Sequence, residues 1–140
     1  AALATMLALA VPALVPAAAV AAEVIVFGGS GKLGAEVVRA LGAAGHEVTV
    51  FRRQGSDLSR LQGLKYREAI GDATSAADVQ AALAARRYDV VVDALAKGRS
   101  DPADFYTRTH RAIVAAAKAN GVRQVILHGS VGAGESRAIY

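Results

Sequence analysis

The sequence predicts an α/β fold with a doubly wound parallel sheet, and three observations support this class. Five apolar runs, most of them rich in β-branched residues, alternate after residue 22 with segments whose apolar residues have helical spacing. A glycine-rich loop joins the first run to a helical segment. The run at 88–94 has an apolar centre, which is typical of a strand buried on both faces. Strands that alternate with helices imply right-handed crossovers, and we expect the strand order 3-2-1-4-5.

The first strand, the first helix and the second strand form one βαβ unit. Glu23–Phe27 is an almost continuous apolar run, so we expect a strand that ends at the glycines of Gly28–Gly34. The next residues, Ala35–Gly45, carry apolar positions at helical spacing, and Gly45 is suited to the helix end. His46–Phe51 follows as a second β-branched run and predicts the second strand.

The later elements alternate in the same way. We expect a strand at 64–70, a helix at 76–87, a strand at 88–94, a helix from 101 to 120 and a strand at 124–128. Ser75 or Thr74 can cap the second helix. Asp101 followed by Pro102 is typical of a helix start, so we expect the third helix to begin there.

Residues 1–22 form a separate apolar leader with no charge before Glu23. We interpret the leader as the hydrophobic part of a secretory signal peptide, because Ala19-Val20-Ala21 offers small residues at a cleavage site. An uncleaved membrane anchor and a buried core helix are the alternatives, and the two prolines and the high alanine content weaken both. If the leader functions, we expect an exported, periplasmic or membrane-attached protein, and otherwise a cytoplasmic one. Residues 23–140 form the single remaining domain.

Composition narrows the classes of function. The chain has 140 residues, of which 54% are hydrophobic and 5% aromatic, and it has no cysteine. Disulfides, thiolate metal sites and a cysteine nucleophile are therefore excluded. The net charge of +4 is scattered along the chain, which argues against a nucleic-acid patch. No His, Asp and Glu cluster has metal-ligand spacing and no Gly-x-Ser-x-Gly elbow is present, so we expect no metal site and no serine hydrolase.

The glycine loop predicts a pyrophosphate-binding site. A helix that begins directly behind a buried strand offers free backbone N–H groups and the positive end of its dipole to an anion. In such loops the first glycine permits a tight turn, the second lets the backbone approach the phosphates, and the third lets the helix pack on the strand. The candidate contacts are Gly28, Gly29, Ser30, Gly31, Lys32, Leu33 and Gly34. The alternatives are a turn that needs positive φ but binds no ligand, and a Lys32 that points to water.

The end of the second strand predicts which dinucleotide binds. An NAD enzyme places a carboxylate there, about 20 residues beyond the glycines, on the ribose 2′-hydroxyl. This chain has Arg52 and Arg53 instead. Because a guanidinium offers a planar fork of donors to a 2′-phosphate, we expect Arg52 to bind that phosphate and NADP(H) to be preferred over NAD(H). A solvated strand end is the alternative explanation for the two arginines.

A family resemblance rests on the GxxGxxG spacing of Gly28–Gly34, on Asp72, on the strand end Asp93–Ala96 and on the segment Gly121–Ser130. Together these resemble the extended and atypical short-chain dehydrogenases/reductases, and the nearest likeness is to the NAD(P)H-binding group similar to NmrA. The resemblance covers residues 23–136. Members of the family usually continue through further strands and a substrate lobe. The resemblance therefore implies an incomplete, C-terminally truncated, cofactor-binding portion.

The resemblance also implies roles for single residues. Ser130 lies after the fifth strand, where the family has a serine that hydrogen-bonds the substrate carbonyl, and we expect it to be catalytic. Asp72 is expected beside the adenine, and Ala94 and Leu95 beside the cofactor. The family's proton donor is a Tyr in a Tyr-x-x-x-Lys motif, whose lysine lowers the Tyr pKa. Tyr140 is the last residue of the sequence, so it is not assigned this role.

One segment departs from the extended enzymes. Tyr106–His110 stands where many of them carry an Asn and a Gly-Thr pair, which favours the atypical branch. We expect His110 and His128 to be packing or rim residues rather than catalytic bases.

We therefore expect an NADP(H)-binding oxidoreductase that acts on a small carbonyl or similar reducible substrate. A non-catalytic NADP-sensing or assembly protein similar to NmrA is one alternative. An NAD-dependent sugar-nucleotide epimerase is the other, and Arg52 and Arg53 count against it. The expected partners are the dinucleotide and a small-molecule substrate, with a homo-oligomer left open. A membrane is a partner only if the leader is an uncleaved anchor.

Overall fold

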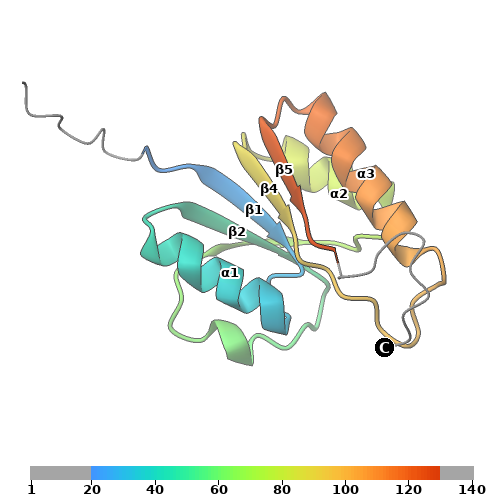
Figure 1. Cartoon of the computed structure of the whole chain (residues 1–140), viewed down its shortest axis with the longest axis horizontal. Coiled ribbons are helices and arrows are strands. Elements are labelled where there is room, and N and C mark those ends of the chain that lie inside the picture. Colours follow the sequence, from blue (N-terminus) through green and yellow to red (C-terminus); the bar gives the residue numbers. More distant parts are fainter. Residues whose placement is uncertain (1–19, 130–140) are drawn as a thin grey trace, which may run out of the picture.

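The computed structural model describes residues 20–129 as one sheet between two layers of helices (Figure 1). In chain order the elements are β1 (Glu23–Phe27), α1 (Lys32–Ala43), β2 (Glu47–Arg52), the 3-10 helix η1 (Ser59–Leu61), β3 (Arg67–Ile70), α2 (Ala76–Ala84), β4 (Val90–Asp93), α3 (Phe105–Ala119) and β5 (Gln124–Leu127). Residues 1–19 of the leader lie outside the described residues, so the signal-peptide interpretation stays a prediction.

The sheet has the order β3-β2-β1-β4-β5, and every neighbouring pair of strands is parallel. β1 lies at the centre, where Ile25 is in register with Thr49 of β2 and with Val91 of β4. The predicted fold class and strand order are therefore confirmed. In sheets of this topology the chain changes direction of progress between the first and fourth strands, and ligands bind at the carboxyl ends of the strands beside that point.

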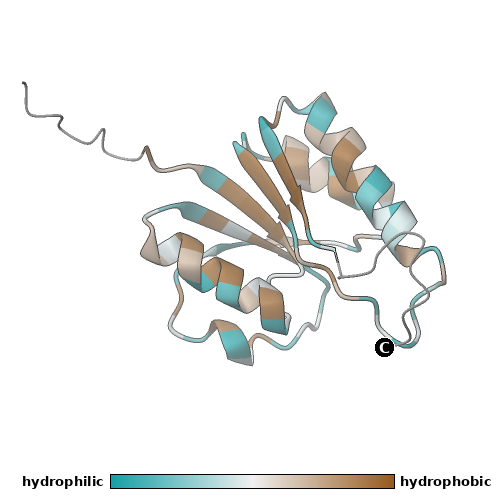
Figure 2. Cartoon of the chain, viewed as in Figure 1, coloured by the Kyte–Doolittle hydropathy of each residue, from teal (hydrophilic) through white to brown (hydrophobic). Residues whose placement is uncertain are grey.

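Two apolar layers attach the helices to the sheet, because successive side chains of a strand point to opposite faces. Ile25 and Phe51 pack with residues of α2 and α3 on one face. Val26 and Val50 pack with residues of α1 on the other. Figure 2 shows hydrophobic residues along the centres of the strands, with hydrophilic residues where several strands begin. Burial on both faces explains why β1 and β4 have almost no polar residues.

The start of α3 differs from the prediction. Asp101 and Pro102 were expected to open this helix, but it begins at Phe105, so that prediction is wrong. The Asp101 carboxylate is used within the preceding loop, where it accepts a hydrogen bond from the Gly98 N–H at 2.7 Å. A turn closed by the Phe105 N–H and the Pro102 carbonyl then separates this loop from the helix.

The other boundaries agree more closely with the sequence. Ser75 caps α2 as expected, since its hydroxyl accepts a hydrogen bond from the Asp78 N–H at 3.2 Å. α1 begins at Lys32, earlier than the expected Ala35, because the extended backbone of Gly31 already serves as its N-cap. The short helix η1 between β2 and β3 was not predicted.

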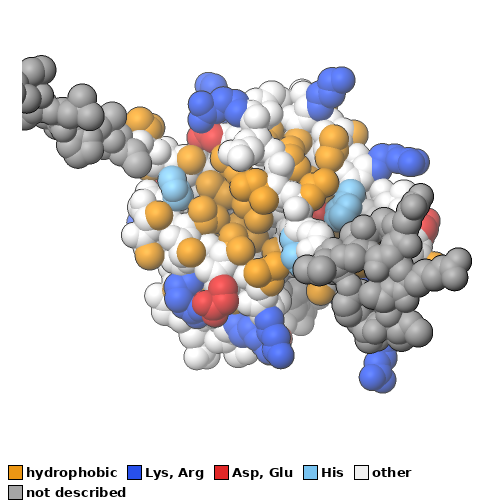
Figure 3. Space-filling model, viewed as in Figure 1, with side chains coloured by type: hydrophobic (Ala, Val, Ile, Leu, Met, Phe, Trp, Pro, Cys, Tyr) orange, Lys and Arg blue, Asp and Glu red, His pale blue; other side chains and the backbone are white. Residues whose placement is uncertain are grey.

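The α1 side of the sheet is less covered at β4 and β5 than at β1 and β2. Ile126 of β5 is 45% exposed. Figure 3 shows apolar side chains gathered on this viewed face, between α1 and α3. Within residues 20–129, no helix is long and apolar enough to cross a membrane.

Candidate functional site

The glycine loop at the end of β1 is closely packed against the backbone around it. Gly28 has φ of +75°, and a Cβ there would lie 2.8 Å from the carbonyl oxygen of Ala94 at the end of β4. A Cβ on Gly34 would lie 2.0 Å from the carbonyl oxygen of Gly28. Both clashes involve backbone atoms, which cannot move aside as a flexible side chain can. The roles predicted for these two glycines, a tight turn and close helix packing, therefore correspond to the geometry.

The N-terminus of α1 supplies hydrogen-bond donors that the protein itself does not use. Its N-cap, Gly31, has no side chain to accept a hydrogen bond, and no acidic residue lies in the first turn. The first N–H groups of a helix have no acceptor within the helix. Those of Lys32 and Leu33, both exposed, are therefore available, with the positive end of the helix dipole, to an anionic group.

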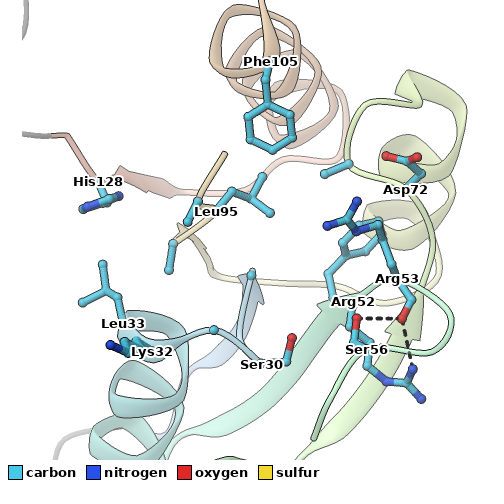
Figure 4. A pocket seen from close by; sticks show the side chains of 16 residues that line it. Ser30, Lys32, Leu33, Arg52, Arg53, Ser56, Asp72, Leu95, Phe105 and His128 are labelled. Atoms are coloured by element: carbon cyan, nitrogen blue, oxygen red, sulfur yellow. Dashed lines mark hydrogen bonds between the residues drawn. The ribbon is translucent and has the colours of Figure 1, made fainter. Parts of the chain in front are cut away.

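A cavity of about 330 Å³ lies in front of this helix end, at the carboxyl ends of the strands (Figure 4). Among the predicted site residues that the structure describes, ten line the cavity: Gly28, Ser30, Gly31, Lys32, Leu33, Arg52, Arg53, Asp72, Ala94 and Leu95. Gly29 and Gly34 are buried behind the loop. Ser130 lies outside the described residues, so its catalytic role stays a prediction. Ser56 and Phe105 also line the cavity, and no motif in the sequence indicates them.

The two arginines after β2 have different partners. The Arg52 guanidinium donates to a carboxylate oxygen of Glu68 on β3 at 2.6 Å, and only 12% of its side chain is exposed. The Arg53 side chain is 66% exposed and lies 3.8 Å from an Asp101 carboxylate oxygen. Figure 4 shows Arg53 on the side of the cavity where Asp72 lies, whereas the Arg52 guanidinium turns to the Arg53 carbonyl. Nε of Arg52 is buried without a hydrogen-bond partner. Arg53 is the more exposed and less closely paired of the two cations, and the predicted contact of Arg52 with a 2′-phosphate stays a prediction.

Asp72 lies at the end of β3 with one carboxylate oxygen already bonded. The Thr74 N–H donates to it at 2.8 Å and the Thr74 hydroxyl at 2.7 Å. These hydrogen bonds lower the pKa of Asp72, and the positive charges of Arg53 and Arg108 add to this effect. Asp72 is therefore an ionised acceptor at the cavity wall, and its predicted contact with adenine stays a prediction.

The end of β4 holds the opposite wall of the loop in place. The Asp93 carboxylate accepts the Leu95 N–H at 2.9 Å, and the Ala94 N–H donates to the Phe27 carbonyl of β1 at 2.9 Å. The turn that follows places the Ala94 carbonyl directly against Gly28. Asp93 thus fixes the backbone that faces the glycine loop.

Asp93 is also the most unusual acid of this edge. Its side chain is 1% exposed, and burial raises its pKa, against the opposing effects of the Leu95 N–H and of His110 and His128. Nε2 of His110 lies 3.0 Å from the second carboxylate oxygen, but the pair lacks the alignment of a hydrogen bond. The sequence predicts His110 to be a packing or rim residue, without a specific partner. The acid at the end of an apolar strand and the histidine on the next helix could have been paired only with the fold known.

No metal site competes with this interpretation among residues 20–129, because no group of three or more His, Asp or Glu side chains there is arranged to hold a metal ion.

Comparison with known proteins identifies the same part of the chain. A family model described as NAD(P)H-binding matches residues 28–139, which begin at the first glycine of the loop. Sterol demethylase protein B of Methylococcus capsulatus is 34% identical over 113 residues. The alignment covers 78% of this chain but only 34% of that protein, so the chain spans about a third of its length.

Two solved structures have a similar fold. A nucleoside-diphosphate-sugar epimerase from Pseudomonas aeruginosa is 26% identical, with a TM-score of 0.64, over 79% of this chain and 34% of the epimerase. ChuY, an anaerobillin reductase from Escherichia coli O157:H7, is 25% identical, with a TM-score of 0.65, over 81% of this chain and 53% of the reductase. The family model's match contains the glycine loop and the strands β2 to β5, in agreement with the resemblance to short-chain dehydrogenases/reductases. The nearer likeness to NmrA stays a prediction.

Proposed function

This chain belongs to the NAD(P)H-binding family, and from that premise we propose that it is part of an NADP(H)-dependent oxidoreductase that acts on a small carbonyl or similarly reducible substrate. The observation that carries the proposal is the pairing of two features across one cavity. The free N–H groups at the start of α1 suit a pyrophosphate, and the exposed guanidinium of Arg53 suits a 2′-phosphate.

Each part of the cavity has a role toward the dinucleotide. Gly31 leaves the approach to the helix end open, and the N–H groups of Lys32 and Leu33 donate to the pyrophosphate. Arg53 donates to the 2′-phosphate. Asp72 lies where it can accept from the adenine amino group. When bound, the reduced nicotinamide would supply a hydride for transfer to the substrate.

The oxidoreductase activity finds support in the relatives, since one protein of similar fold is named as a reductase. In the predicted scheme Ser130 hydrogen-bonds the substrate carbonyl. One structural relative is an epimerase, so an NAD-dependent sugar-nucleotide epimerase remains the alternative, and tighter binding of NADH than of NADPH would favour it. The NmrA-like alternative also stays testable, because it would bind dinucleotide without turnover.

Two measurements test the proposal. Calorimetric titration with NADPH and NADH should give tighter binding of NADPH, and Arg53→Asp should reverse or abolish that preference while NADH still binds. Equal affinities in the wild type, unaffected by Arg53→Asp, would remove the claim of NADP(H) preference. Oxidation of NADPH in the presence of a panel of aldehydes, ketones and quinones tests turnover. Tight binding without oxidation of NADPH by any of them would favour the sensing alternative.

The leader carries a separate proposal, which is export or attachment to a membrane. Expression of the whole protein, followed by fractionation and N-terminal mass analysis, should give a chain cleaved after Ala21 or Ala22, or one retained in the membrane fraction. An uncleaved protein in the soluble cytoplasmic fraction would contradict both outcomes.

A further inference from the structure

The loop between β4 and α3 places a carboxylate beside the cation that is proposed to bind the 2′-phosphate. One Asp101 oxygen lies 3.8 Å from the Arg53 guanidinium. The other accepts the Gly98 N–H at 2.7 Å, which fixes the carboxylate in its loop. Only 11% of the Asp101 side chain is exposed. Asp101 is therefore held in place by its own loop, whereas the longer and more exposed Arg53 is free to change partners.

Arg53 lies near more than one negative group. Besides Asp101, the ionised Asp72 lies close enough for the Arg53 charge to lower the pKa of its carboxyl. The neighbouring cation, Arg52, is already neutralised by Glu68. The end of β2 therefore presents one available positive charge together with two carboxylates, a poorer site for a doubly charged phosphate than the paired arginines suggest.

The same carboxylate affects the two dinucleotides differently. A 2′-phosphate that binds Arg53 competes with Asp101 for its guanidinium, and it then lies within a few ångströms of a fixed like charge. Like charges at such separations repel each other, and the repulsion is not fully screened because it acts over less than the Debye length of roughly 8–10 Å. A 2′-hydroxyl carries no charge and does not need Arg53, so NAD(H) meets neither penalty.

We propose that Asp101 is a specificity-determining residue that limits the preference for NADP(H) by competing with the 2′-phosphate for Arg53. The inference rests on the proposed function, since it assumes that a dinucleotide binds in this cavity. The competition is electrostatic, so its effect depends on ionic strength, whereas a purely structural role of the loop would not.

The test compares Asp101→Asn with a matched control, Asp104→Asn. The amide of Asp101→Asn keeps an oxygen that can accept the Gly98 N–H, so the loop is retained while the charge is removed. Asp104 lies in the same loop, exposed, and its replacement removes the same charge from the chain. We expect Asp101→Asn to tighten NADPH binding by roughly threefold to tenfold, to leave NADH binding within about twofold, and to lose most of this gain at high salt. Asp104→Asn should change neither affinity by more than about twofold.

A double variant assigns the effect to Arg53. In an Arg53→Ala background the substitution Asp101→Asn should lose most of its effect on NADPH, because the competition no longer exists. An unchanged ratio of NADPH to NADH affinity in Asp101→Asn, or an equal gain in Asp104→Asn, would overturn this inference while leaving the proposed function intact. Failure of the wild type to bind either dinucleotide would overturn the proposed function and this inference with it.

Discussion

The two edges of the sheet differ in how closely their charged groups are paired within the protein. At the edge where the strands begin, Arg67 of β3 pairs with Glu23 of β1 at 3.1 Å and with Glu47 of β2 at 3.0 Å. Arg123, just before β5, pairs with Asp89, just before β4, at 3.1 Å. At the edge where the strands end, no side chain caps the N-terminus of α1. The guanidinium of Arg53 there lies 3.8 Å from the Asp101 carboxylate, a longer separation than in the pairs at the other edge.

This difference separates a structural edge from a binding edge. Where charges pair across neighbouring strands, their hydrogen-bonding capacity is used within the protein and little remains for a ligand. Where donors lack close partners, an anion can supply them. Arg52 and Arg53 both line the cavity but differ in their pairing, because Arg52 lies 2.6 Å from Glu68 whereas Arg53 lies 3.8 Å from Asp101.

The largest predicted effect is on the free energy of unfolding, when a glycine of the binding edge is replaced by alanine and compared with a glycine elsewhere. Gly34→Ala should destabilise the protein by about 3 kcal/mol or more, because its Cβ would lie 2.0 Å from the Gly28 carbonyl oxygen. Gly42→Ala in the same helix meets nothing within 4 Å and should stabilise it by about 0.5–1 kcal/mol. Urea unfolding of both variants measures the contrast. Equal and small effects would mean that the loop is not packed as described.

The next effect separates the two arginines. Arg53→Ala should weaken NADPH binding by about tenfold or more while leaving the free energy of unfolding within about 0.5 kcal/mol. Arg52→Ala should instead destabilise the fold by about 1 kcal/mol, because it removes the 2.6 Å ion pair with Glu68 and the packing of a side chain that is only 12% exposed. Calorimetry and urea unfolding of each variant measure both quantities. A larger loss of NADPH affinity in Arg52→Ala would contradict this division.

A smaller effect concerns the pH dependence of stability, which two acids determine in opposite directions: Asp89, just before β4, and Asp93, its last residue. Burial raises the pKa of Asp93, so its contribution to stability is present below the ordinary pKa of 3.8 and is lost as the pH rises through the folded value. The Glu23 N–H and the Arg123 charge lower the pKa of Asp89, so its contribution is present above 3.8 and is lost as the pH falls.

The stability of the wild type relative to Asp93→Asn and relative to Asp89→Asn should therefore change with pH in opposite directions at the two ends of β4. Relative to Asp93→Asn, the wild type should lose stability as the pH rises from about 3.8. Relative to Asp89→Asn, it should lose stability as the pH falls below that value. Chemical unfolding over a pH series measures both differences. Slopes of the same sign would show that the two edges do not differ as proposed.

The smallest effect concerns the structural edge. Arg67→Ala removes two partly exposed ion pairs and should cost no more than about 1 kcal/mol. NADPH and NADH affinities should stay within about twofold of the wild type, because Arg67 lies at the far edge from the glycine loop. A substantial loss of dinucleotide binding in this variant would mean that the binding site extends to the wrong edge.

The sequence predicted the parts of the fold that depend on local pattern. The apolar run of β1 and the glycine spacing after it determine the strand to the residue and the turn that follows it, whereas α1 begins three residues before the expected Ala35. The start of α3 was predicted wrongly, because Asp101 and Pro102 are equally suited to a helix start and to a loop. The Gly98 N–H, three residues earlier in the same loop, takes the Asp101 carboxylate and so distinguishes the two uses.

The candidate site was predictable in outline but not in its pairing. The glycine loop, Asp72 and the two arginines line one cavity, as the order of the strands implies. That Arg52 pairs with Glu68, and that Asp93 lies against His110, depends on which strands and helices are neighbours in space. Sequence spacing carries no such information for residues on different elements.

The most direct test of a binding edge opposite a structural edge is a titration of the ¹⁵N-labelled protein with NADP⁺, followed by amide chemical shifts. The largest changes should occur at Ser30–Gly34, at Arg53 and at Leu95, with a further response at Asp101. The amides of Glu23, Glu47 and Arg67 should stay nearly unchanged. Changes concentrated at those three residues, or no saturable change at the glycine loop, would contradict the central claim.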